Sequence, residues 1–311
     1  MIRHLGYACQ NLSLQTGRKL SERIQTSRTI RMSNFTRQRA GELAVSNSAD
    51  LLPILRWNAQ NGIRFFRIGS DIFSFMDHPT LSYALEDLDS NHRTEIVANF
   101  AKAGAFAKAN GMRLSCHPGP YTCLGSPNSD IVDKSITSLR MHSLIADLLG
   151  YGEEFAINIH VGGVYEDKAA TAKRFVAVYK QLPPLLRQRL TVENDDKASM
   201  WSMQDLWQLV HEPCGVKLVL DIHHHKFCDG GNTLQAAAKL AFATWTGFSE
   251  IPKVHYSESR PDSRPQAHSD YLKEPIPLLC DHTQYDIMIE AKSKDLALLH
   301  YKKEVLNETT N

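Results

Sequence analysis

The amino-acid sequence predicts a single (β/α)8 barrel, the TIM-barrel fold, and three observations support this fold class. Eight short apolar runs along the 311 residues have the composition of buried strands. Helical patterns lie between them, which favours parallel strands joined by right-handed crossovers. Six runs end on a histidine or a carboxylate, as expected where the carboxyl ends of parallel strands meet at one mouth.

The predicted elements follow one another regularly. Each strand is a short apolar run, and the helices over residues 92–109 and 132–149 each carry an apolar stripe. The first of these helices stops at Asn110-Gly111 and the second before Gly150, because both sites favour a left-handed helix end. In order along the chain, the predicted strands are residues 2–7, 63–68, 112–116, 155–160, 190–194, 217–221, 252–256 and 285–290.

The chain shows no repeat, low-complexity tract or linker, and we expect one domain. The barrel would cover residues 1–295, and residues 296–311 would form a C-terminal helical tail with a polar end. A barrel of this kind typically uses about 250 residues.

Charge and cysteine content restrict the possible partners and the compartment. With 35 Lys and Arg against 34 Asp and Glu, the formal net charge is +1, so the protein as a whole has no strong positive field that would indicate nucleic-acid binding. Residues 18–39 are nevertheless basic, and they form either a phosphate-binding rim or a solvated loop. The basic residues in this segment are Arg18, Lys19, Arg23, Arg28, Arg31, Arg37 and Arg39.

Six cysteines without a C-x-x-C pair are read as reduced thiols. The N-terminus lacks the apolar region of a secretory signal, and no stretch approaches 18 uninterrupted apolar residues. We therefore expect a soluble, cytoplasmic protein that does not associate with a membrane.

The residues that end the apolar runs are of the types that bind metal ions. Imidazole mixed with hard carboxylate oxygen suits Mn²⁺ or Zn²⁺, with Fe²⁺ as a further alternative. The run Asp221-Ile222-His223-His224-His225 adds imidazoles one turn beyond a strand end. The six residues that end the runs are His117, His160, Glu193, Asp221, His255 and Glu290.

Three functions are compatible with such a site. A metal-dependent phosphodiesterase is the first, because one ion can activate water while another neutralises the leaving oxygen. A sugar isomerase is the second, since such barrels also place Glu, Asp and His around two ions. The third is a nucleic-acid-binding barrel with a structural metal, which is disfavoured because structural sites are usually closed and four-coordinate.

A series of motifs runs in order along about residues 1–295: Gly6-Tyr7 with Asn11-Leu12, Phe66-Arg67-Ile68-Gly69-Ser70-Asp71, His117-Pro118-Gly119-Pro120-Tyr121, His160-Val161-Gly162-Gly163, Glu193-Asn194-Asp195, Asp221-Ile222-His223-His224, Lys253-Val254-His255 and Glu290-Ala291-Lys292. Together these motifs resemble the ultraviolet damage endonuclease family. Members of that family resemble endonuclease IV in fold and metal cluster. They nick double-stranded DNA immediately 5′ of pyrimidine dimers, with Mn²⁺ as the metal.

The resemblance implies three divalent ions. Glu193 would bridge two of them and so set the spacing that an in-line displacement needs. Endonuclease IV has an Asp two residues before the histidine equivalent to His268, where this chain has Gln266. The first ion would be held by His117, His160 and Glu193, the second by Glu193, Asp221, His255 and Glu290, and the third by His224 and His268.

Lys253 is expected to face the same cluster. It lies two residues before His255, and residues i and i+2 of a strand share one face. An ammonium there is unfavourable, so the amine either stays neutral or reacts with CO2 to give an anionic carbamate. The resemblance favours the carboxylated lysine, and a lysine that extends to solvent is the alternative.

The resemblance also implies how the lesion is bound. Pro120 and Tyr121 would act as a wedge in kinked DNA, while Tyr7 and Asn11 would contact the extruded dimer. The family commonly has Gln in place of Pro120, and proline offers no side-chain donor or acceptor. This difference leaves the range of lesions open.

The implied function is hydrolysis of the DNA phosphodiester immediately 5′ to ultraviolet photoproducts, both pyrimidine dimers and 6-4 photoproducts. Three divalent ions, manganese first with zinc or iron as alternatives, would serve a monomeric enzyme. An abasic-site endonuclease of the endonuclease IV type is the runner-up, and the sugar isomerase is third.

Overall fold

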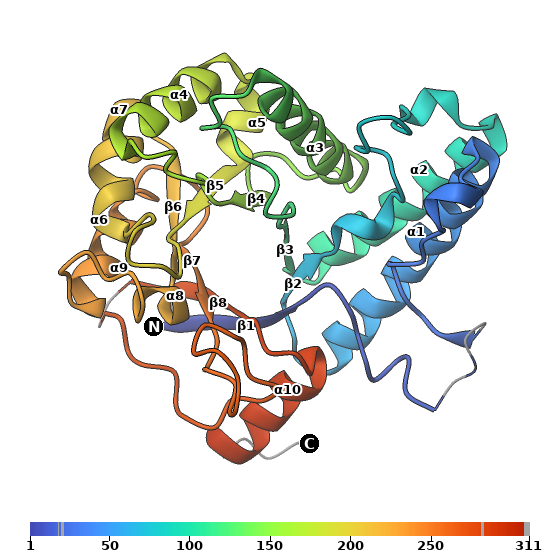
Figure 1. Ribbon diagram of the computed structural model, residues 1–311. Coiled ribbons are helices and arrows are strands. Elements are labelled where there is room, and N and C mark those ends of the chain that lie inside the picture. Colours follow the sequence, from blue (N-terminus) through green and yellow to red (C-terminus); the bar gives the residue numbers. More distant parts are fainter. Residues whose placement is uncertain (18, 20–21, 281–282, 308–311) are drawn as a thin grey trace.

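The structure is a computed structural model, and it describes residues 1–17, 19, 22–280 and 283–307. Eight parallel strands close into a barrel in the order β1-β2-β3-β4-β5-β6-β7-β8, and Figure 1 shows them at the centre of a ring of helices. The predicted (β/α)8 barrel and all eight strands are confirmed. The strands are β1 Ile2–Ala8, β2 Phe65–Ile68, β3 Arg113–Cys116, β4 Ala156–Ile159, β5 Leu190–Glu193, β6 Lys217–Asp221, β7 Lys253–Tyr256 and β8 Tyr285–Ile289.

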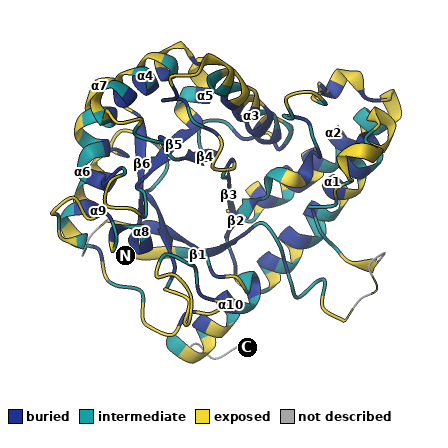
Figure 2. Cartoon of the chain, viewed as in Figure 1, coloured by how far each residue is buried: buried dark blue, intermediate teal, exposed yellow. Residues whose placement is uncertain are grey.

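Apart from the exposed start of β1, the strands are buried on both faces, and Figure 2 shows them largely in the buried colour while the outer faces of the helices are exposed. In β1 the alternation of side chains sends Tyr7 outward into the core beneath the helices, whereas Ala8 packs inside the barrel with Phe65 and Met288. Gly6 is required by close approach, since a Cβ there would lie 2.4 Å from the carbonyl oxygen of Phe65.

The amino-terminal end of the barrel holds an ion-pair network around the buried carboxylate of Asp286. Asp286 of β8 accepts from Arg3 of β1 at 2.6 Å and from Arg113 of β3 at 3.0 Å. The Arg113 guanidinium also lies 5.4 Å from the ring centroids of both Phe65 and Trp245. Charge pairing and ring contacts together compensate the burial of these ions.

The two helices predicted from the sequence are present and begin a few residues earlier than expected. Helix α2 follows Asp89, whose side chain accepts from the Asn91 amide, and α3 follows Asn128, which caps it in the same way. The helices are α1 Arg37–Gln60, α2 Ser90–Ala109, α3 Ser129–Leu148, α4 Lys168–Gln181, α5 Pro184–Arg189, α6 Met203–Leu206, α7 Glu212–Cys214, α8 Ile222–His225, α9 Leu234–Ala243 and α10 Lys294–His300.

Shorter helical segments complete the described chain. Three are 3₁₀ turns, and two are π-helical segments that extend α6 and α10. The 3₁₀ turns are Met32–Asn34, Ser70–Ile72 and Leu85–Asp87, and the π segments are Trp207–His211 and Tyr301–Val305.

The last helix is tied to the barrel. In α10, Asp295 is fully buried, and its carboxylate accepts from the Leu12 amide at 2.6 Å and from the Ser13 hydroxyl at 2.6 Å. The expected boundary between residues 295 and 296 therefore falls inside a helix that packs against β1.

Part of the basic segment at residues 18–39 is engaged within the protein. Arg28 lies 2.6 Å from Asp50 and donates to the carbonyl oxygen of Gln25, while Arg39 pairs with Glu42. Arg18 lies outside the described residues. All six cysteines are free thiols. Among the described helices, none is both long and apolar enough to span a membrane.

Candidate metal centre

The barrel brings the six predicted strand-end residues to its carboxyl-terminal mouth. Glu193 and Asp221 are the last residues of β5 and β6, and His255 is the third residue of β7. The other three follow their strands directly: His117 after β3, His160 after β4 and Glu290 after β8. Closure of a parallel barrel is the reason that residues far apart in the sequence meet here.

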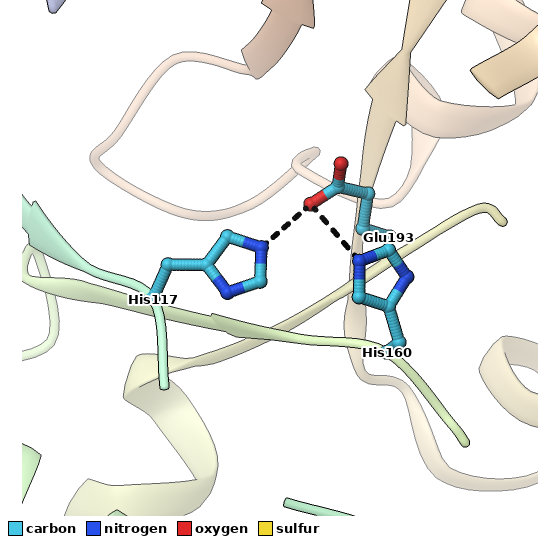
Figure 3. Close-up of side chains that lie close together, drawn as sticks. All are labelled: His117, His160 and Glu193. Atoms are coloured by element: carbon cyan, nitrogen blue, oxygen red, sulfur yellow. Dashed lines mark hydrogen bonds and ion pairs between the residues drawn. The ribbon is translucent and has the colours of Figure 1, made fainter. Parts of the chain in front are cut away.

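Glu193 lies at the centre of the cluster and is 1% exposed. Its Oε2 is 3.2 Å from His117 Nε2 and 3.1 Å from His255 Nδ1, and 4.0 Å from His160 Nε2. Its Oε1 lies 3.6 Å from His224 Nδ1. Figure 3 shows His117 and His160 directed at the same carboxylate oxygen.

Three overlapping groups within the described residues have the composition and spacing to hold metal ions. In each group the ligand atoms lie within 4.8 Å of one another. Glu193 belongs to two groups and Asp221 to two, so both carboxylates are placed to be shared. The groups are His117 with His160 and Glu193, Glu193 with Asp221 and His224, and Asp221 with His255 and Glu290.

The group of His117, His160 and Glu193 is the same as the ligand set expected for the first ion. The other two groups differ from the sets expected for the second and third ions. Glu193 is not in the group of His255 and Glu290, and His224 joins Glu193 and Asp221 instead of standing with His268 alone. The His224 and His268 ring centroids are 6.2 Å apart, and His268 Nδ1 lies 2.8 Å from the backbone oxygen of Glu290. His268 therefore borders the cluster but lies outside the three groups.

The buried polar atoms of this mouth fit a bound cation. Asp221 Oδ2 and both ring nitrogens of His255 are buried without a hydrogen-bond partner. Buried polar atoms are nearly always hydrogen-bonded, and unpaired ones need an explanation such as an ion. Imidazole nitrogen and carboxylate oxygen are ligands for Mn²⁺, Zn²⁺ or Fe²⁺.

The electrostatics of the mouth favour positive charge. Burial raises the pKa of Glu193, but the facing imidazoles of His255 and His160 outweigh it and hold this pKa well below its usual range. Burial lowers the pKa of His160, yet Glu193 and Asp195 raise it to about 9. Against the same effect of burial, Asp221 and Glu193 raise the pKa of His224 to about 10. The carboxylates therefore attract protons to His160 and His224 when no stronger cation is bound, whereas burial lowers the pKa of His117 to about 4 and also lowers the pKa of His255.

Three residues of the centre were not predicted from the sequence. The guanidinium of Arg67, in β2, forms an ion pair with Glu290. The Asn158 amide, in β4, donates to Glu193. Asn194 pairs its side chain with the backbone of Asp221, accepting from its amide at 2.8 Å and donating to its carbonyl at 3.1 Å. The signal for Arg67 and Asn158 is a polar residue inside an otherwise apolar strand.

Lys253, the first residue of β7, is buried in the barrel with 1% exposure. Its Nζ has no hydrogen-bond partner. Burial, together with the positive charge of Arg113, lowers the pKa of this amine to about 7. The expected alternative of a lysine reaching solvent is therefore wrong, because the side chain is enclosed.

The structure separates the four residues expected at the lesion. Tyr7 and Asn11 are both fully buried, the Tyr7 hydroxyl donates to Asn58 at 2.6 Å, and the Asn11 amide donates to Tyr7 at 2.9 Å. Their predicted contact with DNA disagrees with these positions, because the strand alternation turns Tyr7 away from the mouth. Pro120 is exposed.

Tyr121 is 89% exposed and stands on the wall of a cleft of about 690 Å³. The cleft is lined by the loops that follow β2 and β3, by α3 and by Tyr165 from the segment after β4, and Phe75 and His78 also stand in its walls. Ser70, also in the wall, donates to the backbone oxygen of His117 at 3.4 Å, so the cleft borders the metal centre.

The fold and the three groups define a TIM-barrel protein with a cluster of His, Asp and Glu side chains at its mouth that could hold metal ions. Residues 3–310 match the family described as UV-endonuclease UvdE, and the chain belongs to this family.

The alignments with relatives cover nearly all of this chain but different shares of the relatives. The UV-damage endonuclease of Schizosaccharomyces pombe is 36% identical over 94% of this chain, and the chain spans only 49% of that relative. The UV DNA damage endonuclease of Clostridium perfringens is 30% identical over 99% of this chain and 72% of its own.

Two solved structures share the fold. The crystal structure of SacUVDE has a TM-score of 0.83 and 29% identity, and the match covers 98% of this chain and 99% of that one. Endonuclease IV from Thermus thermophilus has a TM-score of 0.54 and 16% identity, with 98% of this chain and 100% of that one covered, which shows likeness of fold alone.

Proposed function

We propose that this protein is a metal-dependent DNA repair endonuclease that hydrolyses the phosphodiester immediately 5′ to ultraviolet photoproducts. The observation that carries the proposal is the convergence of the Glu193, Asp221 and Glu290 carboxylates with several imidazoles at the carboxyl-terminal mouth of the barrel. Relatives that match most of the chain are named UV-damage endonucleases. Membership of the UV-endonuclease family also favours an endonuclease over a sugar isomerase.

Three divalent ions, Mn²⁺ first with Zn²⁺ or Fe²⁺ as alternatives, fit the three ligand groups. Bound there, such ions would lower the pKa of a water molecule and neutralise charge on the phosphate. Glu193 would contribute to two of the sites and hold them at a fixed spacing. Arg67 would fix the orientation of Glu290 and balance its charge through their ion pair.

Lys253 is proposed to be a carboxylated lysine. Carbamate formation needs a neutral amine, and a pKa of about 7 supplies one near neutral pH. The amine nitrogen would bond to the carbon of CO2 and release a proton, which leaves an anion. That anion would compensate the positive charges of Arg113 and Arg67, which now act unfavourably on the ammonium.

The wedge is proposed to be Tyr121 with Pro120, on the exposed loop after β3. An aromatic ring at 89% exposure has little structural reason to be there, and stacking on a nucleobase is what such a ring offers. The adjoining cleft, with Phe75 and Tyr165 in its walls, has space for extruded bases next to the metal centre.

The decisive experiment compares irradiated, abasic and intact duplexes incubated with Mn²⁺, with the nick mapped at nucleotide resolution. Nicks directly 5′ of dimers support the proposal. Incision at abasic sites with none at dimers would contradict the proposal and indicate an abasic-site endonuclease. That alternative is compatible with Pro120 in the position where the family commonly has Gln. Binding that does not weaken with salt would argue against phosphate contacts altogether.

A further inference from the structure

Three consecutive residues at the end of β5 face three different parts of the metal centre. Glu193 supplies the central carboxylate. The backbone oxygen of Asn194 accepts from His224 Nδ1 at 2.8 Å. Asp195 Oδ1 lies 3.1 Å from His160 Nδ1. In both His224 and His160, Nδ1 therefore lies close to this segment, and Nε2 is the nitrogen left for an ion.

We propose that Asp195 is a positioning residue that fixes the tautomer and ring orientation of His160, so that Nε2 is the nitrogen presented to a metal ion. His160 Nε2 lies on the side of Glu193 Oε2, at 4.0 Å, while Nδ1 faces Asp195. A carboxylate beside one ring nitrogen keeps the proton there and raises the basicity of the other.

The Asp195 carboxylate is 15% exposed, and the main chain of this residue is hydrogen-bonded to a neighbouring segment. Its amide donates to the carbonyl oxygen of Trp201 at 2.9 Å, and the buried Trp201 indole donates to the carbonyl of Gly162 at 2.7 Å. Gly162 is two residues after His160. The carboxylate and the imidazole thus belong to one connected framework, which limits how far either can move.

The ring N–H of His160 does not point straight at Asp195, so the 3.1 Å contact is an ion pair without hydrogen-bond alignment. Asp195 Oδ2 is likewise buried without a partner. In the proposed arrangement the imidazole aligns Nδ1 with the carboxylate and keeps Nε2 on the side of Glu193. The contact is therefore placed to select the tautomer.

The test measures metal binding in the absence of DNA. Asp195→Asn keeps the size of the side chain and removes its charge, and Asp196→Asn makes the same change one residue further on, at a side chain outside the three ligand groups. Stepwise Mn²⁺ titration should show one ion bound about 10–100-fold more weakly in Asp195→Asn. Asp196→Asn should match the parent.

A second measurement needs no substitution. In the zinc-loaded parent, long-range proton–nitrogen NMR should show His160 protonated at Nδ1. Protonation at Nε2, or unchanged affinity in Asp195→Asn, would overturn the inference even if the enzyme is active.

The inference rests on the proposed function only in requiring a bound divalent ion. If the parent itself binds no divalent ion, both the proposed metal-dependent function and the inference about Asp195 fail. If the parent binds ions and nicks irradiated DNA while Asp195→Asn binds them equally well, only the role of Asp195 fails.

Discussion

Replacing Glu193 by Gln removes one negative charge from the centre of the cluster and changes the shape of the side chain very little. The carboxylate is 1% exposed, so water does not screen it, and ring nitrogens of three imidazoles lie 3.1, 3.2 and 4.0 Å from its Oε2. An ion held by those nitrogens would lose its nearest compensating charge.

The size of the effect follows from these distances. Unit charges about 4 Å apart interact by about 4 kcal/mol at an effective dielectric constant of about 20, which corresponds to about a thousandfold in affinity. Because Glu193 belongs to two ligand groups, we expect weakened binding at both. Nicking of irradiated duplex should fall by at least the same factor.

The assay combines metal content after dialysis, a Mn²⁺ titration and nicking of irradiated duplex. Glu250→Gln is the matched control, since Glu250 is 8% exposed and pairs with Lys217 at 3.3 Å away from the cluster. The control should retain metal and activity even if it is less stable. Near-parental metal content and nicking in Glu193→Gln would remove the bridging carboxylate from the mechanism.

Three further predictions concern the lysine, the wedge and pH. Native mass spectrometry should show about 44 Da added at Lys253, and Lys253→Ala should lose metal rather than fold; a clean unmodified mass at neutral pH would contradict the carbamate. Tyr121→Ala should weaken binding of irradiated duplex by about 1–3 kcal/mol, and Pro120→Gln should change it by at most roughly tenfold; equal binding by Tyr121→Ala would exclude the wedge. Because the metal-free imidazoles of His160 and His224 have pKa values of about 9 and about 10, ion binding must displace their protons. The affinity for Mn²⁺ should therefore rise with pH up to that range, by about tenfold per pH unit for each proton displaced. An affinity for Mn²⁺ that does not change between pH 6.5 and 9 would contradict this prediction.

The barrel and the positions of the six strand-end residues could be predicted because both follow from local pattern. A short apolar run ending on His117 or Glu193 specifies a strand and the end of it that faces the mouth. Closure of the barrel then brings these strand ends together. Membership of the ligand groups was harder to predict. It depends on side-chain directions, and these place His224 with Glu193 and leave His268 outside.

Residues whose roles depend on distant partners could not be read from the sequence. Tyr7 looks like a residue of the mouth because it lies near the end of β1, but the alternation of that strand turns it outward to Asn58. Arg67 is meaningful only once Glu290, 223 residues later, lies beside it. Topology produces contacts of such separation, so a polar residue within an apolar strand marks Arg67 as unusual but does not identify its partner.

The two ends of the barrel differ in what holds them together. At the amino-terminal end, Arg3, Asp286 and Arg113 join β1, β8 and β3 with charges that the chain itself supplies and balances. At the carboxyl-terminal end, strands β3 to β8 contribute carboxylates and imidazoles that leave atoms such as Asp221 Oδ2 unpaired. Cohesion at the amino-terminal end is thus intrinsic to the polypeptide, whereas at the carboxyl-terminal end the proposed metal ions would add to it. Under the proposed function, scarcity of metal would therefore act on the carboxyl-terminal mouth and leave the ion pairs of the opposite end unchanged.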